Sequence, residues 1–371
     1  MKIAKLIHAS PSEIDTHAIK ARLTKFLLDL RSRKLAKELV GDDERSESLD
    51  SDNLTSLADE LSDGVELTWG DDNRINTRIA RLSARRKAAS GFAHLKDNEI
   101  RRLRPLMSGV RLEEPQTIHW ADEVASALHE EMPWMAPATK EVWYALRHNA
   151  VSNQAIRLPP LLLNGPPGLG KSVWARRLSE LLRVPRCEID ASVGGVGFSV
   201  VGVERGWSSA QPGRPLETIL KHKVANPLVV IDEVCKSQSA STEMGARHSF
   251  ADSLLNLLET ETSATWVCPF FQINIDMSHI SWVMTANEAC NIPSPLLSRC
   301  TVVDLACLSS SQLKAFARRQ ALEVGLSGAS TEAIEHVIDR WPKSGKTSIS
   351  FRTVSRMLRR AEVLERRSAY H

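Results

Sequence analysis

The segment from Gly165 to Ser172 reads GPPGLGKS, which fits the P-loop pattern G-x-x-x-x-G-K-[ST]. An apolar run, LPPLLLNG, leads into it and a helical pattern, VWARRLSELL, follows it, as such a loop requires. Backbone N–H groups of a glycine-rich loop curl around phosphates, and the helix N-terminus adds partial positive charge. The segment therefore predicts a nucleotide site.

The expected ligands are ATP and Mg²⁺. Lys171 would reach the β- and γ-phosphates, and the hydroxyl of Ser172 would coordinate the metal. The residues expected to bind the cofactor are Gly165, Pro166, Pro167, Gly168, Leu169, Gly170, Lys171, Ser172, Val173 and Asp232.

Two later strand ends could complete the chemistry. The run PLVVIDE ends on Asp232, expected to hold Mg²⁺ through water, and Glu233, expected to polarise the attacking water. The run VMTAN ends on Asn287, which could orient that water. A carboxylate pair can also cap a helix, and asparagine commonly ends strands. The order of P-loop, acidic strand and polar strand end favours a catalytic function.

Five short apolar runs must position these residues: LPPLLLNG, RCEIDA, PLVVIDE, SWVMTAN and CTVVDL. Strands buried on both faces of a parallel sheet have this appearance, and helical segments separate them here. We predict an α/β P-loop domain over residues 106–306. After Leu308 only helical patterns follow, one of them opened by Ser309 and Gln312 at capping-box spacing, so residues 307–371 should form a helical domain.

The first 105 residues form a mostly helical region of uneven charge. Apolar residues recur at helical spacing between Pro11 and Val40. The stretch from Gly41 to Asp72 is acidic, whereas Arg74 to Arg104 is basic. The basic stretch could bind phosphates, or the two stretches could neutralise each other within a chain or between neighbouring subunits.

Composition narrows the class of protein. The chain of 371 residues carries a formal charge of +3, which argues neither for nor against a polyanionic partner. No apolar run approaches the roughly 18 residues that span a bilayer, and the N-terminus lacks a secretory core. The six cysteines are scattered without a C-x-x-C pair, which suits thiols better than disulfides or zinc. We expect a cytoplasmic protein without a membrane partner.

From about Pro159 to Arg360 the sequence resembles an AAA+ ATPase, and more narrowly the ATPase module of the Lon protease family. The resemblance includes IDEVCKS, with Cys235 where that family usually has aspartate, and FADSLLNLLETE. It extends over the whole of FQINIDMSHISWVMTANEACNIPSPLLSR.

The resemblance implies further residue roles. Asn287 matches the sensor 1 residue, and Arg299 matches the arginine finger that reaches ATP in the neighbouring subunit. Arg352 matches the sensor 2 arginine of the lid, although Ser350 replaces the usual glycine nearby. The alternatives are a surface arginine for Arg299 and a helix salt bridge for Arg352. A finger acting between subunits implies a homo-oligomer, most often a hexameric ring.

The segment GWSSAQPGRP aligns with the first pore loop of Lon, which places Trp207, followed by Ser208, against the substrate. Trp266 lies near the position of a second pore loop. An aromatic ring grips an extended polypeptide through apolar, shape-tolerant contacts. Trp207 could instead cover a subunit interface. Trp134, Trp143 and Tyr144 could pack near adenine or simply in the core.

These residues favour a protein translocase or unfoldase. The chain ends at His371, directly after the lid, where Lon continues into its protease domain, so we expect no peptidase activity. A partner protease or nuclease would be a separate protein of unknown identity. Two alternatives stay open: a motor or clamp acting on DNA, as in some phage-defence systems, and a nucleotide-switched assembly scaffold.

Overall fold

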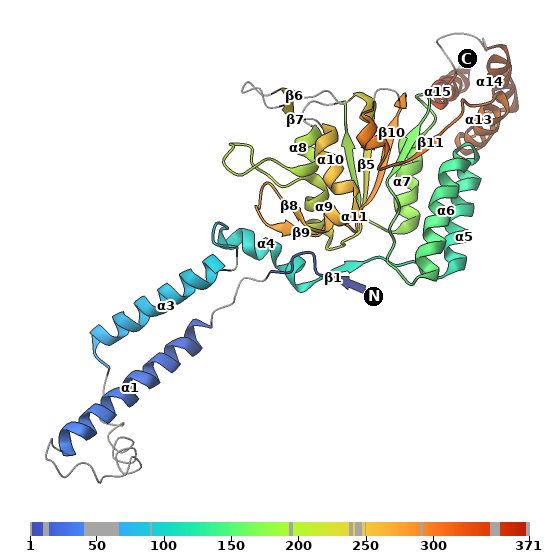
Figure 1. Ribbon diagram of the computed structural model, residues 1–371. Coiled ribbons are helices and arrows are strands. Elements are labelled where there is room, and N and C mark those ends of the chain that lie inside the picture. Colours follow the sequence, from blue (N-terminus) through green and yellow to red (C-terminus); the bar gives the residue numbers. More distant parts are fainter. Residues whose placement is uncertain are drawn as a thin grey trace. The chain divides into compact units, whose positions relative to one another are not determined.

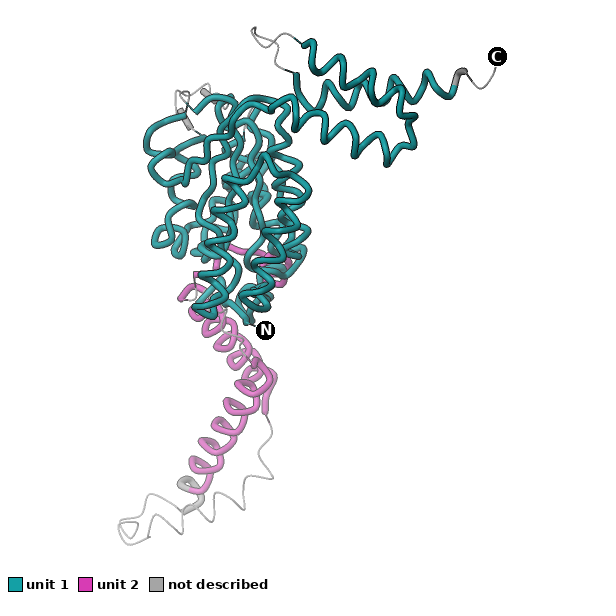
Figure 2. Tube along the Cα trace, turned by 90° about the vertical axis from the view of Figure 1, so that its right-hand side faces the viewer, with its two compact units in different colours: residues 1–8, 102–371 teal, residues 9–101 magenta. Residues whose placement is uncertain are grey.

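A computed structural model describes most of the chain. The described residues are 2–9, 15–40, 67–89, 91–192, 196–236, 240–241, 247–248, 250–289, 292–341 and 349–368. Most of the predicted acidic stretch and Cys290 lie outside them. The chain divides into two compact units, residues 1–8 with 102–371 and residues 9–101 (Figure 2).

The larger unit is built on a parallel sheet of five strands in the order β11-β3-β10-β5-β4. The strands are β3 (Leu161–Asn164), β4 (Arg186–Asp190), β5 (Leu228–Asp232), β10 (Ser281–Ala286) and β11 (Thr301–Asp304). Each of the five predicted apolar runs forms one of them, so the predicted α/β fold is confirmed.

Helices cover both faces of this sheet (Figure 1). They include α5 (Ile118–Glu131), α6 (Ala136–Val151), α7 (Lys171–Leu182), α8 (Val196–Val201), α9 (Arg214–His222) and α10 (Phe250–Leu258). The central strand β10 is buried along its whole length, and Trp174 of α7 is fully buried among the core residues. Burial on two faces explains why the inner strands β3, β5 and β10 are continuously apolar, whereas the edge strand β4 alternates between buried and exposed residues.

Short elements complete the unit. They are η3 (Pro133–Met135), η4 (Val234–Lys236), β6 (Ala240–Ser241), β7 (Arg247–His248), α11 (Thr260–Ala264), β8 (Trp266–Val267), β9 (Asn274–Ile275) and α12 (Ser294–Leu297). Strands β8 and β9 pair as an antiparallel hairpin.

The N-terminal strand belongs to the larger unit, which differs from the predicted boundary at residue 105. β1 (Lys2–Ala4) pairs antiparallel with β2 (Val110–Leu112). The backbone N–H groups of Leu6 and Ile7 donate to Leu106 O at 3.0 and 3.3 Å. The sequence could not reveal this pairing because β1 is short and its partner is distant along the chain.

Three C-terminal helices, α13 (Ser310–Val324), α14 (Gly328–Arg340) and α15 (Phe351–Ser368), share an apolar cluster of their own. The predicted capping box is present, with Ser309 and Gln312 each bonded to the other's backbone N–H. We call these helices the lid.

The described part of the smaller unit consists mainly of α1 (Thr16–Val40) and α3 (Trp69–Ala89), and α4 (Asp97–Ser108) begins in it. Asp71 of α3 is buried and lies 2.6 Å from Arg31 of α1. Hydrogen bonds from Thr68, together with the Arg31 charge, lower the pKa of Asp71. In neither unit do the described residues include a helix long and apolar enough to cross a bilayer.

Candidate nucleotide site and the loops beside it

The glycine-rich loop connects β3 to α7, as expected for a P-loop. Gly168 adopts a positive φ of 83°, and a Cβ atom there would lie 2.6 Å from Cβ of Ser350. Because Ser350 immediately precedes α15, the lid packs directly against the loop. Ser350 is therefore close enough to require glycine at position 168.

The side chain of Lys171 is largely buried and folds back over the loop. Its ammonium group donates to Gly165 O, to Pro166 O at 3.2 Å and to Asn287 Oδ1 at 3.1 Å. Burial lowers the pKa of Lys171, and electrostatic interactions with the neighbouring side chains, among them Asp232 and Glu233, partly offset this. The lysine predicted to bind phosphate and the asparagine predicted to orient water thus lie together.

Asp232 accepts two hydrogen bonds at the end of β5. Its Oδ1 atom accepts from Ser172 Oγ at 2.7 Å and from Thr285 Oγ1 at 3.0 Å. Mg²⁺ prefers oxygen ligands and keeps several waters, so a hydroxyl beside a carboxylate suits it. The two predicted metal residues, Ser172 and Asp232, therefore fit a magnesium ion. No sequence motif singled out Thr285.

Glu233 stands in a strained backbone position, with φ of 59°. A non-glycine residue at positive φ is uncommon and often marks a functional site. Its carboxylate is about one-third exposed and pairs with Lys236 at 2.8 Å. The backbone N–H of Glu233 donates to Thr285 Oγ1 at 3.0 Å, which fixes the turn after β5.

A cavity of about 580 Å³ lies between the P-loop and the lid. Lys171, Ser172, Glu233 and Asn287 line it together with Arg352. Three further arginines that no sequence motif singled out also line it: Arg319, Arg356 and Arg359. The sequence held a signal for two of them, because residues 352, 356 and 359 share one helix face at i, i+4 and i+7 spacing.

Aromatic side chains form the apolar part of this cavity. Trp134, Phe316 and Phe351 line it, and both Trp134 and Phe316 pack against the Phe351 ring, with centroids 4.3 and 4.5 Å apart. An apolar wall beside a phosphate-binding loop suits a flat base. Trp143 instead lines a separate groove between α5 and α6, which contains no P-loop residue.

Arg299, which follows α12, does not line this cavity. Its Nε atom lies 2.6 Å from Glu259 Oε1, although its N–H does not point along that line, so the contact is an ion pair without a hydrogen bond. Its Nη1 group donates to Pro295 O at 3.0 Å. The side chain is 28% exposed, so part of it is accessible from outside the chain.

Trp207 lies on a loop between α8 and α9 and is 64% exposed. The base of the loop is closed by a bridge between Gly202 and Pro212 and by a hydrogen bond of 2.8 Å from Val203 N to Gln211 O. Ser208 beside Trp207 is also exposed. The segment is therefore a defined projection that presents an indole to solvent.

Trp266, the second predicted substrate contact, is only 8% exposed, which contradicts that prediction. It lies in β8 and pairs with Ile275 of β9. Successive side chains of a strand point to opposite faces, so the next residue, Val267, is the one that faces outward, with 56% exposure. The hairpin also contacts the Trp207 loop, because Arg205 Nε donates to Phe270 O at 3.4 Å.

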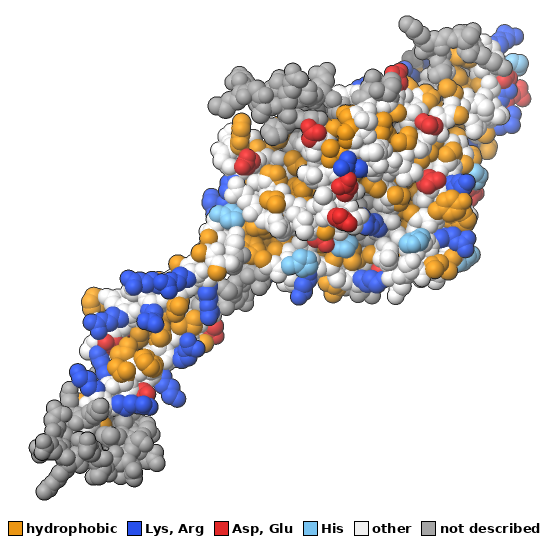
Figure 3. All heavy atoms as spheres, viewed as in Figure 1, with side chains coloured by type: hydrophobic (Ala, Val, Ile, Leu, Met, Phe, Trp, Pro, Cys, Tyr) orange, Lys and Arg blue, Asp and Glu red, His pale blue; other side chains and the backbone are white. Residues whose placement is uncertain are grey.

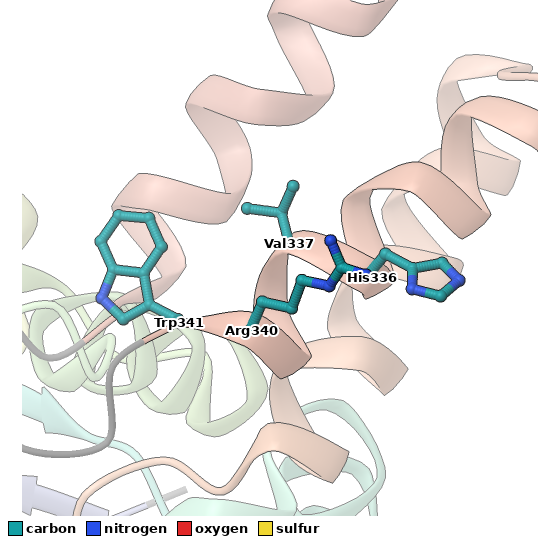
Figure 4. Close-up of a pocket in the computed structure, with 4 residues that line it drawn as sticks. All are labelled: His336, Val337, Arg340 and Trp341. Carbon is teal, nitrogen blue, oxygen red and sulfur yellow. The ribbon is translucent and has the colours of Figure 1, made fainter.

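A smaller hollow of about 270 Å³ lies at the end of α14. His336, Val337, Arg340 and Trp341 line it, and the His336 ring points away from Trp341 (Figure 4). It shares no lining residue with the cavity at the P-loop.

The larger unit has the fold and the P-loop of an AAA+ module. Residues 161–306 match the family model described as "ATPase family associated with various cellular activities (AAA)". A solved closed-state structure of Hsp104 with ATPγS and FITC casein has the same fold. Its TM-score is 0.51 at 15% identity, covering 83% of this chain and 55% of that one.

Among curated proteins, the module is similar to the ATPase region of Lon proteases. The mitochondrial Lon protease homolog of Caenorhabditis briggsae is 35% identical over 148 residues, which are 39% of this chain and 15% of that protein. The Lon protease of Mycoplasmopsis agalactiae is 28% identical over 193 residues, which are 52% and 19% of the two chains. The chain thus spans less than a fifth of the length of these relatives. The family model that matches residues 161–306 describes ATPases, which supports nucleotide binding by this module.

Proposed function

We propose that this chain hydrolyses Mg-ATP in a homo-oligomeric ring, hexameric as in Lon-type ATPases, and uses the energy to pull or remodel a polypeptide in the cytoplasm. Lys171, Ser172 and Asp232 would hold the phosphates and Mg²⁺. Glu233 would activate water, with Asn287 orienting it. Arg299 would act on the neighbouring subunit's ATP, and Arg352 on its own. Trp207 and Ser208 would contact the substrate.

The observation that carries the proposal is the exposed indole of Trp207 on a loop with a closed base. A large aromatic side chain is normally buried, because its apolar surface is the main source of its stabilising effect. A loop that holds it in solvent suits transient contact with apolar side chains of an unfolded chain.

The alternative of a pore that tracks DNA finds less support at this loop. Arg205, the nearest cation before Trp207, is turned toward the β8–β9 hairpin, where its guanidinium lies 5.7 Å from the Phe270 ring centroid. The exposed tip of the loop therefore offers Trp207 and Ser208, whereas the exposed Arg214 lies beyond the closed base, at the start of α9.

The test measures ATP hydrolysis alone, with casein as an unfolded polypeptide and with duplex DNA. We expect casein to raise the rate of the native protein and Trp207→Ala to abolish this stimulation, whereas Trp207→Tyr retains it. Trp69→Ala is the matched control, because Trp69 is also exposed (82%) but lies in the smaller unit. Stimulation by DNA alone, unaffected by Trp207→Ala, would refute the proposal.

A further inference from the structure

The smaller unit carries a row of exposed arginines on one side of α3. With 3.6 residues per turn, the row lies within an arc of about 60° and is about 16 Å long. Its members, called the α3 arginine stripe below, are Arg74, Arg78, Arg81 and Arg85. Figure 3 shows Lys and Arg side chains gathered along the helices of this unit, with few acidic ones between them.

The stripe lies beside the face of α3 that packs against α1, not on it. That packing face contains Ile75, which is buried, and Ile79 and Leu82, which are partly buried. The stripe is displaced from this face by about one residue, or 100° around the helix. Its guanidinium groups are therefore presented to solvent on an ordered helix and are not needed to hold the two helices together.

The two carboxylates of α3 form ion pairs with α1 and not with the stripe. Asp71 pairs with Arg31 at 2.6 Å, and Asp72 pairs with Lys20 at 3.3 Å. Across the described part of the chain, no carboxylate pairs with any arginine of the stripe. Most of the acidic stretch that could neutralise these arginines lies outside the described residues, and its described members, Asp71 and Asp72, pair with α1 instead.

We propose that the α3 arginine stripe binds the phosphate backbone of duplex DNA. Four cations in one row, without a carboxylate partner among the described residues, match a surface with closely spaced phosphates, and arginine pairs with phosphate through two parallel N–H donors. Proteins that bind single strands interleave aromatic platforms with their cations. On α3 the aromatic residue is Trp69, which lies about 150° around the helix from the stripe, so a duplex is favoured.

The test is fluorescence anisotropy of a labelled duplex of about 30 base pairs, titrated with the full chain between about 50 and 200 mM salt. The variant is the triple substitution Arg78→Gln, Arg81→Gln and Arg85→Gln. The matched control removes the same charge at exposed positions of the larger unit: Lys221→Gln, Arg340→Gln and Arg360→Gln. Circular dichroism and the ATPase rate without substrate should be unchanged in the stripe variant.

We expect the stripe variant to bind at least about tenfold more weakly and to lose about 2.7 from the slope of log K against log salt, since each phosphate contact contributes about 0.9. The control should keep the native slope. The proposal is overturned if the native chain does not bind at about 50 mM salt, or if both variants behave alike. Equal or tighter binding to single-stranded DNA, duplex RNA or polyglutamate would also overturn it. If the stripe variant melts at a lower temperature than the native chain but binds DNA equally well, the stripe pairs with acidic groups within the chain. That outcome would also overturn the proposal.

Discussion

Trp134 donates its indole N–H to the backbone carbonyl of Leu169 in the P-loop, at 2.9 Å. The same ring packs against Phe351, the first residue of α15, and against the apolar clusters of both the sheet and the lid. One side chain thus links the phosphate loop to the helix that carries Arg352. A change in the position of the lid would therefore shift the P-loop through this side chain.

Replacing Trp134 by Phe should therefore weaken ATP binding several-fold and lower the free energy of unfolding by about 1 kcal/mol, because one hydrogen bond is lost while an aromatic ring remains. Calorimetric titration with ATP and urea denaturation measure the two effects. Trp143→Phe is the control, since it also loses an indole hydrogen bond, to Asp122, but lies outside the cavity. Equal ATP affinities for both variants would rule out this role for Trp134.

Glu233→Gln should bind ATP normally but turn over at least about 100-fold more slowly, because the amide cannot accept a proton from water. Single-turnover hydrolysis measures this. Asp190→Asn provides a comparison, because Asp190 ends the neighbouring strand β4 opposite Asp232 but does not line the cavity. If the Glu233→Gln variant is as fast as the native protein, another group activates the water.

The lowered pKa of Lys171 gives ATP binding a defined pH dependence. Burial disfavours the ammonium form, so the free site loses its charge at a pH below the usual lysine value of 10.5. Phosphate favours the charged form, so binding takes up a proton above that lowered pKa, and the dissociation constant must rise with pH there. Titrations at increasing pH should show this rise in the native protein. In Lys171→Arg, whose guanidinium does not titrate, the curve should stay flat. A flat native curve up to pH of about 10 would contradict the assignment.

Much of the fold could be predicted because strands buried on both faces have a recognisable, continuously apolar sequence. The run PLVVIDE became β5 and SWVMTAN became β10, since a strand covered on both faces cannot alternate with polar residues. The order of the strands could not be read in the same way. β10 lies between β3 and β5 only because the chain crosses over, and that choice depends on packing between distant residues.

The position of Lys171 and Ser172, in a loop between a strand and a helix, could be predicted because it depends on a local motif. Positions that depend on tertiary packing could not. Trp266 and Val267 are adjacent, and only the pairing of β8 with β9 determines which faces outward. Likewise, Arg319 reaches the cavity only because α13 packs beside Glu131, whose carbonyl accepts its N–H at 3.1 Å.

Arg299→Ala should lower turnover by about 10³-fold or more while sparing ATP binding, if its guanidinium acts on a neighbouring subunit. Lys171→Ala should be inactive for a different reason, the loss of phosphate binding. Mixing the two variants should restore activity, because a Lys171→Ala subunit still presents Arg299 to its neighbour. Arg340→Ala, another exposed arginine, should have no effect. If the mixture stays as inactive as its components, Arg299 does not act between subunits.

The closed base of the Trp207 loop depends on Gly213, and two glycine substitutions separate steric overlap from backbone strain. A Cβ atom at Gly213 would lie 2.0 Å from Val200 O, so Gly213→Ala must displace the end of α8, at a cost of about 1–3 kcal/mol or more. At Gly206 nothing lies within 4 Å, but φ is 112°, so Gly206→Ala introduces backbone strain alone. We expect both variants to be less stable by urea denaturation. Only Gly213→Ala should also alter tryptic cleavage after Arg205, because only it opens the base. Native-like cleavage in Gly213→Ala would show that the loop does not need this close approach to hold Trp207 in place.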